Sequence, residues 1–374
     1  MKVALVHDYL KEYGGAERVL EALHEIWPQA LIYTSVYLPN YFGPHKERIG
    51  NWQVKTSFLQ KFPFKEKLIS PFRLLSPFVF ESFDFSSFDV VIVSATGAYT
   101  PNLIITKPNT LHFCYCHTPP RYLYGYPTAR EWRKHWWGRI GGNLVNHFLR
   151  LFDFAASQRV DFFIANSQNT AQRIKKFYRR EAKVIYPPVE INLKSKILNL
   201  KSKDYFLAGG RLARAKRIDL AIKACNKLRL PLKIFGKVFG GYGEELKKIA
   251  GPKVEFLGEV SDQELARLYQ ECQAFLFPAE EEDFGIAPVE AMAAGVPVIA
   301  LRSGGVVESV VEGKTGEFFD KLSVESLVDV LKHFDRKRYN PEDCRKQAEK
   351  FSKERFKKEI LAFVERKLFG YIKK

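Results

Sequence analysis

Short apolar runs alternate with amphipathic stretches along almost the whole chain. The run Val3–Val6, for example, precedes the stretch Val19–Trp27, whose apolar residues recur at helical spacing. Runs of consecutive β-branched residues, without strict apolar–polar alternation, are typical of strands buried on both faces of a parallel sheet. The repeated strand–helix order therefore predicts a doubly wound α/β fold.

The alternation occurs in two series. In the first, we predict strands at Val3–Val6, Leu31–Val36, Val90–Val93, His112–Cys116, Phe162–Ala165 and Lys183–Tyr186, and a helix at Thr170–Tyr178. In the second, we predict strands at Tyr205–Ala208, Leu232–Phe235, Val254–Leu257, Ala274–Phe277 and Val298–Leu301, and helices at Ile218–Leu228, Glu244–Ile249, Asp262–Glu271 and Ile286–Ala294. A capping box from Ser261 to Glu264 marks the start of the third of these helices.

The two series are separated by Pro187-Pro188 and the polar stretch Lys194–Asp204, and a length of 374 residues fits two domains. We expect an N-terminal domain over residues 1–190, a C-terminal domain over 200–350, and a helix over 351–374 that packs back toward the first domain. Sheets of this kind bind ligands at the carboxyl ends of their strands, so we expect two Rossmann-like domains that face a central cleft.

The chain is strongly basic, because 59 Lys and Arg residues against 42 Asp and Glu residues give a net charge of +17. Such an excess indicates partners, and the candidates are nucleic acid, an anionic membrane surface and phosphate-bearing small molecules. Much of it lies in two aromatic-rich inserts, Trp52–Phe78 and Arg130–Arg150. These inserts are either solvated faces with packed aromatics or a membrane-surface patch, in which aromatic anchors accompany cations attracted to anionic lipid.

The cysteine count and the hydropathy indicate the compartment. Five cysteines in a chain of this length do not make a disulfide framework, which favours a reducing cytosol. The sequence contains no uninterrupted apolar run of about 18 residues, so we expect no transmembrane helix. We therefore expect a cytoplasmic protein that is soluble or peripheral on the cytoplasmic face of the membrane.

The segment Glu280–Gly295, EEEDFGIAPVEAMAAG, is the strongest candidate for chemistry. Glu282 lies in the loop before the helix that begins near Ile286, and Glu290 lies inside that helix. Free N–H groups at a helix start suit an anionic phosphate, and two nearby carboxylates can accept hydrogen bonds from sugar hydroxyls. An acidic loop that caps a helix is the alternative, and spacing alone favours neither.

This segment resembles the signature of the family-4 retaining nucleotide-sugar glycosyltransferases, which have the GT-B fold of two facing Rossmann-like domains. The matching residues are Glu282, Phe284, Gly285, Glu290, Ala291, Met292, Ala293 and Gly295, while Asp283 stands where the family more often has Gly. The resemblance implies that Glu282 contacts hydroxyls of the donor sugar and Glu290 the nucleotide ribose. It also implies that backbone N–H groups from Phe284 through Gly285 to Ile286 hold sugar or phosphate.

A second segment, Gly209–Arg217, follows the first strand of the second domain. A glycine pair with basic residues after a strand is by itself a weak phosphate signal, and basic residues at a helix start are more often solvated. The segment resembles the family's Gly-Arg-Leu…Lys-Gly element, with Arg217 in place of the second Gly. The resemblance implies that Arg211 and Lys216 clamp the donor diphosphate and stabilise it as it leaves.

Two segments of the first domain complete the candidate site. Gly14-Gly15 joins the first strand to the first helix, and the turn either has no ligand or, as in the family, contacts the donor. The stretch from Cys114 to Cys116 and His117 suggests a metal, but the fourth ligand that zinc needs is missing, so we expect none. The same stretch resembles the family's Tyr-x-His-x-Pro, which assigns to His117, and not to His112, a contact near the anomeric centre.

Weaker candidates are Asp8 at the end of the first strand, Asn166-Ser167 before a helix, and the glycine run Gly236–Gly243. Asp8 could face the acceptor, and Asn166-Ser167 matches a recurrent pair of the family or merely caps the helix. The glycine run could lie under the nucleotide, although its spacing fits no dinucleotide fingerprint.

The resemblance predicts a retaining, metal-independent hexosyltransferase that needs no cofactor besides its nucleotide-sugar substrate. Bacterial mannosyltransferases of surface polysaccharide synthesis are the most similar group, so GDP-mannose is the expected donor and a UDP-sugar the alternative. A saccharide, free or linked to polyprenyl diphosphate, is the expected acceptor. Readings of another class are a basic nucleic-acid-binding protein, for which no nucleic-acid motif appears, an NAD-dependent enzyme and a pyridoxal-phosphate phosphorylase.

Overall fold

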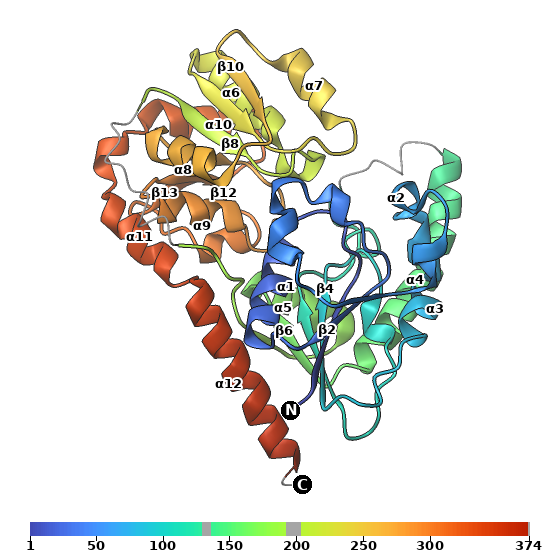
Figure 1. The fold of residues 1–374 in the computed structure, drawn as a ribbon. Helices are drawn as coiled ribbons and strands as arrows, with labels where there is room; N and C mark the ends of the chain where they lie inside the picture. The colour runs from blue at the N-terminus through green and yellow to red at the C-terminus, as the bar shows by residue number, and fades with distance from the viewer. Residues whose placement is uncertain (129–135, 192–202, 373–374) are drawn as a thin grey trace. The chain divides into compact units, whose positions relative to one another are not determined.

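The computed structural model describes residues 1–128, 136–191 and 203–372 (Figure 1). Two compact units divide the chain: unit 1 comprises Met1–Tyr126, Trp132–Pro188 and Glu354–Lys374, and unit 2 comprises Pro127–Glu131 and Val189–Lys353. The terminal helix α12 (Lys353–Ile372) therefore belongs almost entirely to unit 1. Residues 192–202 of the predicted linker, and residues 129–135 of the second aromatic insert, lie outside the described residues.

Unit 1 contains a seven-stranded parallel sheet with the strand order β3-β2-β1-β4-β5-β6-β7. The strands are β1 (Val3–His7), β2 (Leu31–Thr34), β3 (Val54–Thr56), β4 (Val90–Ala95), β5 (Leu111–Cys116), β6 (Phe162–Ala165) and β7 (Ala182–Val184). The direction of winding reverses between β1 and β4, and at such a switch point the carboxyl ends of the strands leave room for a ligand.

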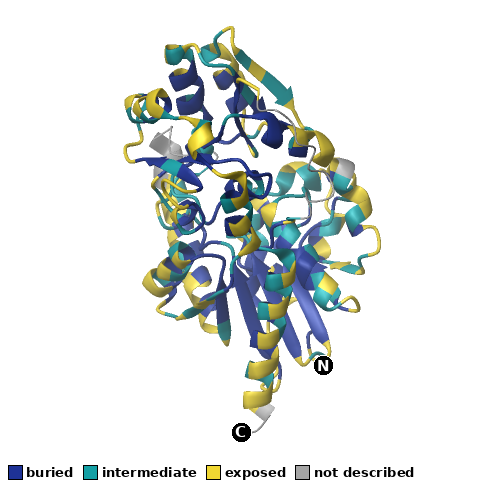
Figure 2. Ribbon diagram, turned by 90° about the vertical axis from the view of Figure 1, so that its left-hand side faces the viewer, coloured by how far each residue is buried: buried dark blue, intermediate teal, exposed yellow. Residues whose placement is uncertain are grey.

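Helices cover both faces of this sheet, which explains the continuous apolar runs. In β1, Val3 and Leu5 point into one core cluster and Ala4 and Val6 into the other, so every residue of the strand is buried (Figure 2). The helices α1 (Gly15–Ile26) and α12 close the first cluster, and α3 (Ser76–Glu81), α4 (Trp136–Gln158) and α5 (Gln168–Tyr178) close the second.

Unit 2 contains a six-stranded parallel sheet with the order β10-β9-β8-β11-β12-β13. Its strands are β8 (Phe206–Gly209), β9 (Leu232–Phe235), β10 (Val254–Gly258), β11 (Phe275–Phe277), β12 (Val298–Leu301) and β13 (Gly316–Phe319). Its helices are α6 (Ile218–Leu228), α7 (Tyr242–Ile249), α8 (Asp262–Glu271), α9 (Ile286–Ala293), α10 (Val324–His333) and α11 (Pro341–Glu349). The hydroxyl of Ser261 accepts a hydrogen bond from the N–H of Glu264 at 3.2 Å, so the start predicted for α8 is present.

The prediction of two doubly wound α/β domains with parallel sheets is confirmed. The sequence patterns did not identify β3 or β13. Strand β3 lies inside the insert Trp52–Phe78 as a three-residue edge strand with one exposed and two half-buried residues, and so short an edge carries almost no hydrophobic pattern. No helix within the described residues is long and apolar enough to cross a membrane.

Candidate functional site

The loop between β11 and α9 carries the acidic motif of unit 2. Gly285, the residue before the helix, has φ +89°, and a Cβ there would lie 3.3 Å from the ring of Phe277. A glycine is therefore required for the chain to enter α9 at this angle. The N-cap residue of the helix, Gly285, offers no side-chain acceptor to the first turn, and the positive end of the helix dipole favours an anion there.

Glu282 and Lys216 form an ion pair, with 2.6 Å between Oε2 and Nζ, although 66 positions separate them in sequence. Lys216 ends the 3-10 turn η8 (Arg214–Lys216), and its ammonium also lies 5.4 Å from the centroid of the Phe277 ring. The side chain of Lys216 is 24% exposed and that of Glu282 is 17% exposed. An ammonium has three N–H donors, so Lys216 can hold the carboxylate and still donate to a phosphate.

Backbone contacts fix Glu282 from the other side. The N–H of Gly305 donates to the Glu282 carbonyl at 2.7 Å, and a Cβ on Gly304 would lie 2.2 Å from the same oxygen. Only glycine allows so close an approach. Gly304-Gly305 thus has a structural role in positioning Glu282.

Arg211 is exposed, and its guanidinium lies over the ring of Phe239 with 5.6 Å to the ring centroid. Phe239 belongs to the glycine run after β9, and a Cβ on Gly236 would lie 1.8 Å from the carbonyl of Gly210. The glycines at the ends of β8 and β9 therefore let two backbone turns pack closely. They provide the platform on which the Arg211 side chain lies.

One departure from the family pattern, Arg217, is compatible with the local backbone. Arg217, where the family has Gly, adopts φ +49°, a left-handed conformation that glycine adopts without cost. Its guanidinium donates to Asp219 at 3.1 Å and lies 4.0 Å from Glu280. Arg217 is therefore engaged by carboxylates of unit 2.

Glu290 and Phe284, two other residues of the motif, differ in burial. Glu290 lies half-buried on α9, one turn after its start, while the ring of Phe284 is buried and packs on Phe351 with 5.3 Å between the centroids. The aromatic side chain of Phe284 therefore anchors the loop, and only its backbone can face a ligand. Ile286 is the first residue of α9 and is half-buried.

In unit 1, His117 follows β5 at the carboxyl end of the sheet. Its Nε2 lies 2.9 Å from the hydroxyl of Ser94. Burial, and then the nearby His7, lower the pKa of His117 to about 3, so the imidazole is neutral at physiological pH. It can therefore hydrogen-bond a polar substrate group, but it does not supply a full positive charge.

Asn166, from the weaker candidate pair Asn166-Ser167, holds the backbone of His117. Asn166 Nδ2 donates to the His117 carbonyl at 2.9 Å, and the Thr170 hydroxyl donates to it at 3.3 Å. Ser167 caps α5 by accepting the N–H of Thr170 at 3.0 Å. Asn166-Ser167 thus combines a helix cap with an anchor for the histidine.

The turn Gly14-Gly15 leads into α1, and the carboxylate of Glu17 accepts the N–H of Gly14 at 2.9 Å. The second oxygen of Glu17 lies 3.6 Å from Nε2 of His7, and both side chains are buried. Neither ring nitrogen of His7 has a hydrogen-bond partner within the described residues. His7 is a site residue that sequence reasoning missed, and its only signal was its place at the carboxyl end of β1.

Asp8, next to His7, is fully buried. One carboxylate oxygen accepts the N–H groups of Thr96 and Ala98 at 3.1 and 3.2 Å, while the other has no partner within the described residues. Burial raises the pKa of Asp8, whereas His7 and these hydrogen bonds lower it. Asp8 thus holds the loop after β4 through one oxygen, and a contact of Asp8 with an acceptor stays a prediction.

The cysteines beside His117 lie in the core. Cys114 accepts a hydrogen bond from Asn102 Nδ2 at 3.3 Å, and His112 Nε2 lies 3.1 Å from the oxygen of the same amide. Within the ranges that the structure describes, no three His, Cys, Asp or Glu residues are grouped so that they could hold a metal ion.

Two family descriptions match the chain. "Glycosyltransferase Family 4" matches residues 13–193, and "Glycosyl transferases group 1" matches residues 190–351. The chain is therefore a nucleotide-sugar glycosyltransferase of the GT-B class, as the two sheets and the loop before α9 indicate. It belongs to glycosyltransferase family 4.

Curated relatives resemble the chain over most of its length. It is 29% identical to the alpha-1,3/1,6-mannosyltransferase ALG2 of Mus musculus over 346 residues, which cover 81% of this chain and 80% of the relative. It is 26% identical to the Schizosaccharomyces pombe alpha-1,3/1,6-mannosyltransferase alg2 over 375 residues, which cover 84% and 70% of the two chains.

Solved structures share the fold at low identity. The Anabaena protein HepE in complex with UDP has a TM-score of 0.68 and 18% identity, with 98% of this chain and all of that chain covered. Sucrose-phosphate synthase from Thermosynechococcus elongatus has a TM-score of 0.73 and 17% identity, with 99% and 100% covered. These neighbours support the GT-B architecture predicted from sequence.

Proposed function

We propose that this glycosyltransferase moves a mannosyl group from GDP-mannose to a saccharide acceptor linked to a lipid, with retention of the α configuration. The observation that carries the proposal is the Lys216–Glu282 pair beside the uncapped start of α9, which combines a phosphate ligand and a sugar ligand in one place. The mannosyltransferase relatives support the choice of sugar.

Unit 2 supplies the donor contacts in this proposal. Arg211, Lys216 and the N–H groups at the start of α9 bind the diphosphate, because two cations and a helix dipole stabilise the charge that develops on the leaving group. Glu282 accepts hydrogen bonds from the mannosyl hydroxyls, and Glu290 accepts them from the ribose. The cations take the place of a metal ion, and no cofactor is needed.

The bond changes can be balanced without a protein nucleophile. The bond between the anomeric carbon and the diphosphate oxygen breaks, and the acceptor oxygen bonds to the same face of that carbon. The acceptor proton passes to the departing phosphate oxygen. His117 of unit 1 acts as a neutral hydrogen-bonding group toward the sugar, and Gly14-Gly15 lets the backbone approach the donor.

The acceptor and its location are part of the proposal. A saccharide on polyprenyl diphosphate at the cytoplasmic face of the membrane fits a basic chain with aromatic inserts. It also agrees with the relatives, whose names describe mannosyl transfer.

Donor-dependent stabilisation tests the proposal. A ligand that binds only the folded state raises the unfolding temperature, so GDP-mannose should raise it more than UDP-glucose, ADP-glucose or GDP-glucose at equal concentration. NMR of the product should then show an α-linked mannose. If a UDP-sugar raises the unfolding temperature more than GDP-mannose does, the donor is a UDP-sugar, the class of nucleotide bound in the HepE structure. If no nucleotide sugar raises the unfolding temperature, the proposal is overturned.

A further inference from the structure

Helix α4 buries polar side chains beside Leu149 and Ala156 and exposes most of its large apolar side chains. Asn146 and Asp153 are buried: the amide of Asn146 donates to the Tyr122 carbonyl at 3.4 Å, and Asp153 accepts hydroxyl hydrogen bonds from Tyr124 and Tyr178 at 2.8 and 3.2 Å. The exposed large side chains of the helix are Leu144, Val145, Phe148, Leu151, Phe152 and Phe154. A surface helix of a globular protein normally shows the opposite arrangement.

The segment from η3 (Phe58–Lys61) through α2 (Lys65–Leu68) and η4 (Pro71–Leu75) to α3 also exposes large apolar side chains. These are Phe58, Phe62, Phe64, Leu74 and Phe78. Phe64 is the most exposed of them, at 69%, and has φ +52°. A left-handed backbone at a bulky residue is unfavourable, so the fold maintains strain at a position whose ring faces outward.

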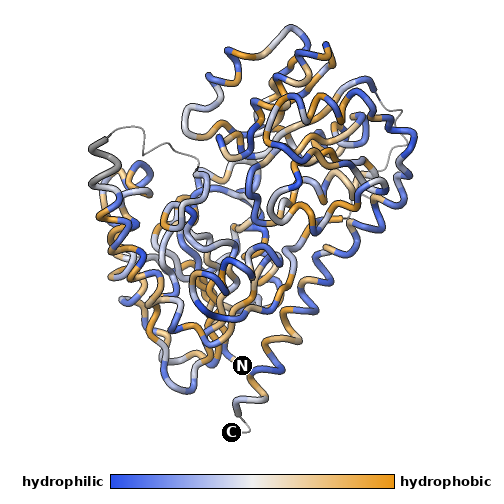
Figure 3. Tube along the Cα trace, turned by 180° about the vertical axis from the view of Figure 1, so that it is seen from behind, coloured by the Kyte–Doolittle hydropathy of each residue, from blue (hydrophilic) through white to orange (hydrophobic). Residues whose placement is uncertain are grey.

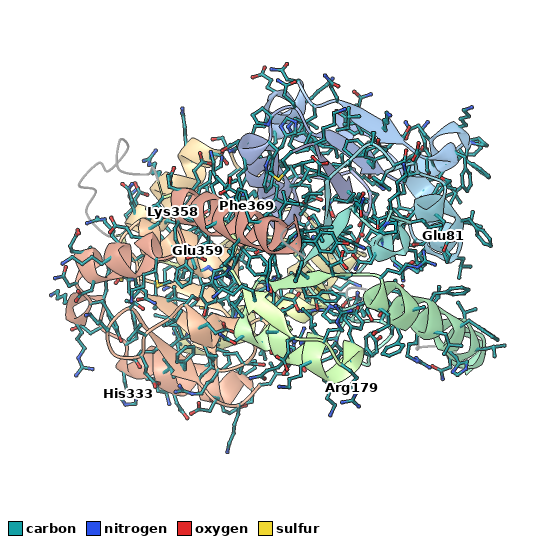
Figure 4. All side chains as sticks on the ribbon, turned by 90° about the horizontal axis from the view of Figure 1, so that it is seen from below. Glu81, Arg179, His333, Lys358, Glu359 and Phe369 are labelled. Carbon is teal, nitrogen blue, oxygen red and sulfur yellow. The ribbon has the colours of Figure 1, made fainter. Side chains whose placement is uncertain are left out.

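The two sets of side chains lie on the same side of unit 1. Leu59 of η3, Val79 of α3 and Ala156 of α4 all pack into one core cluster. Arg159, just after α4, forms an ion pair at 2.7 Å with Glu81 at the end of α3. Figure 1 shows α2, α3 and α4 along one side of the unit, and Figure 4 labels Glu81 at that edge. Figure 3 shows apolar residues along α4 in the view from behind.

We call this surface the α3–α4 face and define it by its outward apolar residues, Phe58, Phe62, Phe64, Leu74, Phe78, Leu144, Val145, Phe148, Leu151, Phe152 and Phe154. Soluble proteins normally expose large apolar side chains singly, whereas this face exposes many of them together.

The charges around the α3–α4 face are almost all positive. The only carboxylate of α4 is the buried Asp153, and the segment from residue 52 to 78 contains Glu66 as its only acidic residue. Its basic residues are Lys55, Lys61, Lys65, Lys67 and Arg73. Apolar and aromatic side chains among cations are typical of proteins that insert shallowly into a membrane with anionic headgroups.

Arg73 connects the face to the site. It is half-buried, and its guanidinium lies over the ring of Tyr122 with 4.1 Å to the centroid. Tyr122 stands five positions after His117 in the loop that follows β5. The face is thus packed directly against the loop of unit 1 that carries the proposed catalytic histidine.

We propose that unit 1 docks on an anionic lipid bilayer through the α3–α4 face, with the apolar side chains in the interfacial layer and the lysines at the headgroups. The proposal extends the proposed function, on which it rests for the reason to dock, because an acceptor linked to a lipid is presented at such a surface. The proposal adopts the membrane-surface reading of the aromatic inserts, because their outer side chains are exposed and the apolar face continues beyond the second insert to Phe154.

Vesicle binding of the purified full-length chain, without donor or acceptor, tests the docking. We compare vesicles of phosphatidylcholine with vesicles that also contain phosphatidylglycerol. The variants are Phe148→Ser with Leu151→Ser on α4, Phe64→Ser with Phe78→Ser on the neighbouring segment, and Lys61→Glu with Lys67→Glu. The matched controls are Phe369→Ser and Lys358→Glu on α12, which closes the opposite face of the sheet; Phe369 is 63% exposed.

The wild type and both controls should bind the anionic vesicles, and each double variant should bind roughly tenfold more weakly, because each loses interfacial burial or attraction to lipid. Unchanged unfolding temperatures show that the variants fold. Absence of wild-type binding, equal binding to neutral vesicles, or double variants that bind like the controls would overturn the proposal. A wild-type dimer that the apolar variants dissociate would also overturn it, since the face would then join two copies.

The two proposals fail separately. If the chain binds anionic vesicles but no nucleotide sugar stabilises it, the proposed function is wrong and the docking stands. If GDP-mannose stabilises the chain and the vesicles do not bind, the docking alone is wrong.

Discussion

The ion pair between Lys216 and Glu282 allows a quantitative prediction. At 2.6 Å, and with an effective dielectric constant of about 20, two unit charges attract by about 6 kcal/mol before desolvation is subtracted. The same ammonium faces a diphosphate that becomes more negative as the glycosidic bond breaks. Loss of one such electrostatic contact in an active site costs roughly 3–4 kcal/mol of transition-state stabilisation. The Lys216→Gln variant should therefore lower kcat by about 100-fold or more, while KM for GDP-mannose changes less.

This effect is measured as the steady-state rate of transfer to a lipid-linked saccharide, with the release of GDP as the readout. Arg214→Gln is the matched control, because Arg214 belongs to the same 3-10 turn, is as exposed as Lys216, and pairs with the carboxylate of Glu245, which is 54% exposed against 17% for Glu282. It should change kcat by less than about threefold. The double variant Lys216→Gln with Glu282→Gln should be less impaired than the product of the two single effects, because the residues are in contact. Equal activity of the Lys216 and Arg214 variants would refute the reasoning.

Three further outcomes are expected. Asn166→Ala removes a donor to the His117 carbonyl and should lower kcat roughly tenfold with little change in donor KM, whereas Asn166→Asp, which keeps the shape but loses the donor, should not restore activity. The free energy of unfolding should fall as the pH drops from about 6.5 toward 3, because burial lowers the pKa values of His112 and His117 to about 3 and the two side chains bind protons only after unfolding. Urea unfolding at several pH values measures this fall. The His112→Gln variant should show a weaker dependence of the free energy of unfolding on pH. Transfer should be unchanged by EDTA and not increased by Mg²⁺ or Mn²⁺ in a GDP-release assay, and a strict metal requirement would show that Arg211 and Lys216 do not replace the ion.

Much of the fold could be read from local patterns. The central strands β1, β4 and β5 are buried along their whole length, so their sequences are mostly apolar and their positions were predicted closely. Strand β13 begins at Gly316 and was missed, because a Cβ there would lie 2.0 Å from the Val298 carbonyl and the strand therefore starts on a residue with little strand propensity. Strand β3 was missed because an edge strand of three residues has no period to detect.

The candidate site divides in the same way. Gly285 and the residues up to Gly295 stand close together in sequence, so their arrangement around α9 follows from local rules for helix starts. The only local signal of His7 was its place at the carboxyl end of β1. Its importance comes from Glu17 at 3.6 Å and from its influence on the pKa of His117, which are contacts between separate elements of unit 1.

The sequence by itself determined two doubly wound halves, the family motif around Glu282 and Glu290, and an excess of positive charge, because these properties depend on residue type and on spacing within one helix or strand. Only the tertiary structure decided that Lys216 pairs with Glu282, that Asn166 anchors His117, and that α4 directs its apolar side outward. Each of these depends on which elements the sheet brings together. The hydrophobic pattern of α4 is the same whether its apolar side is buried or exposed. Only the buried partners of the helix, such as Tyr178 at Asp153, show which side faces the core.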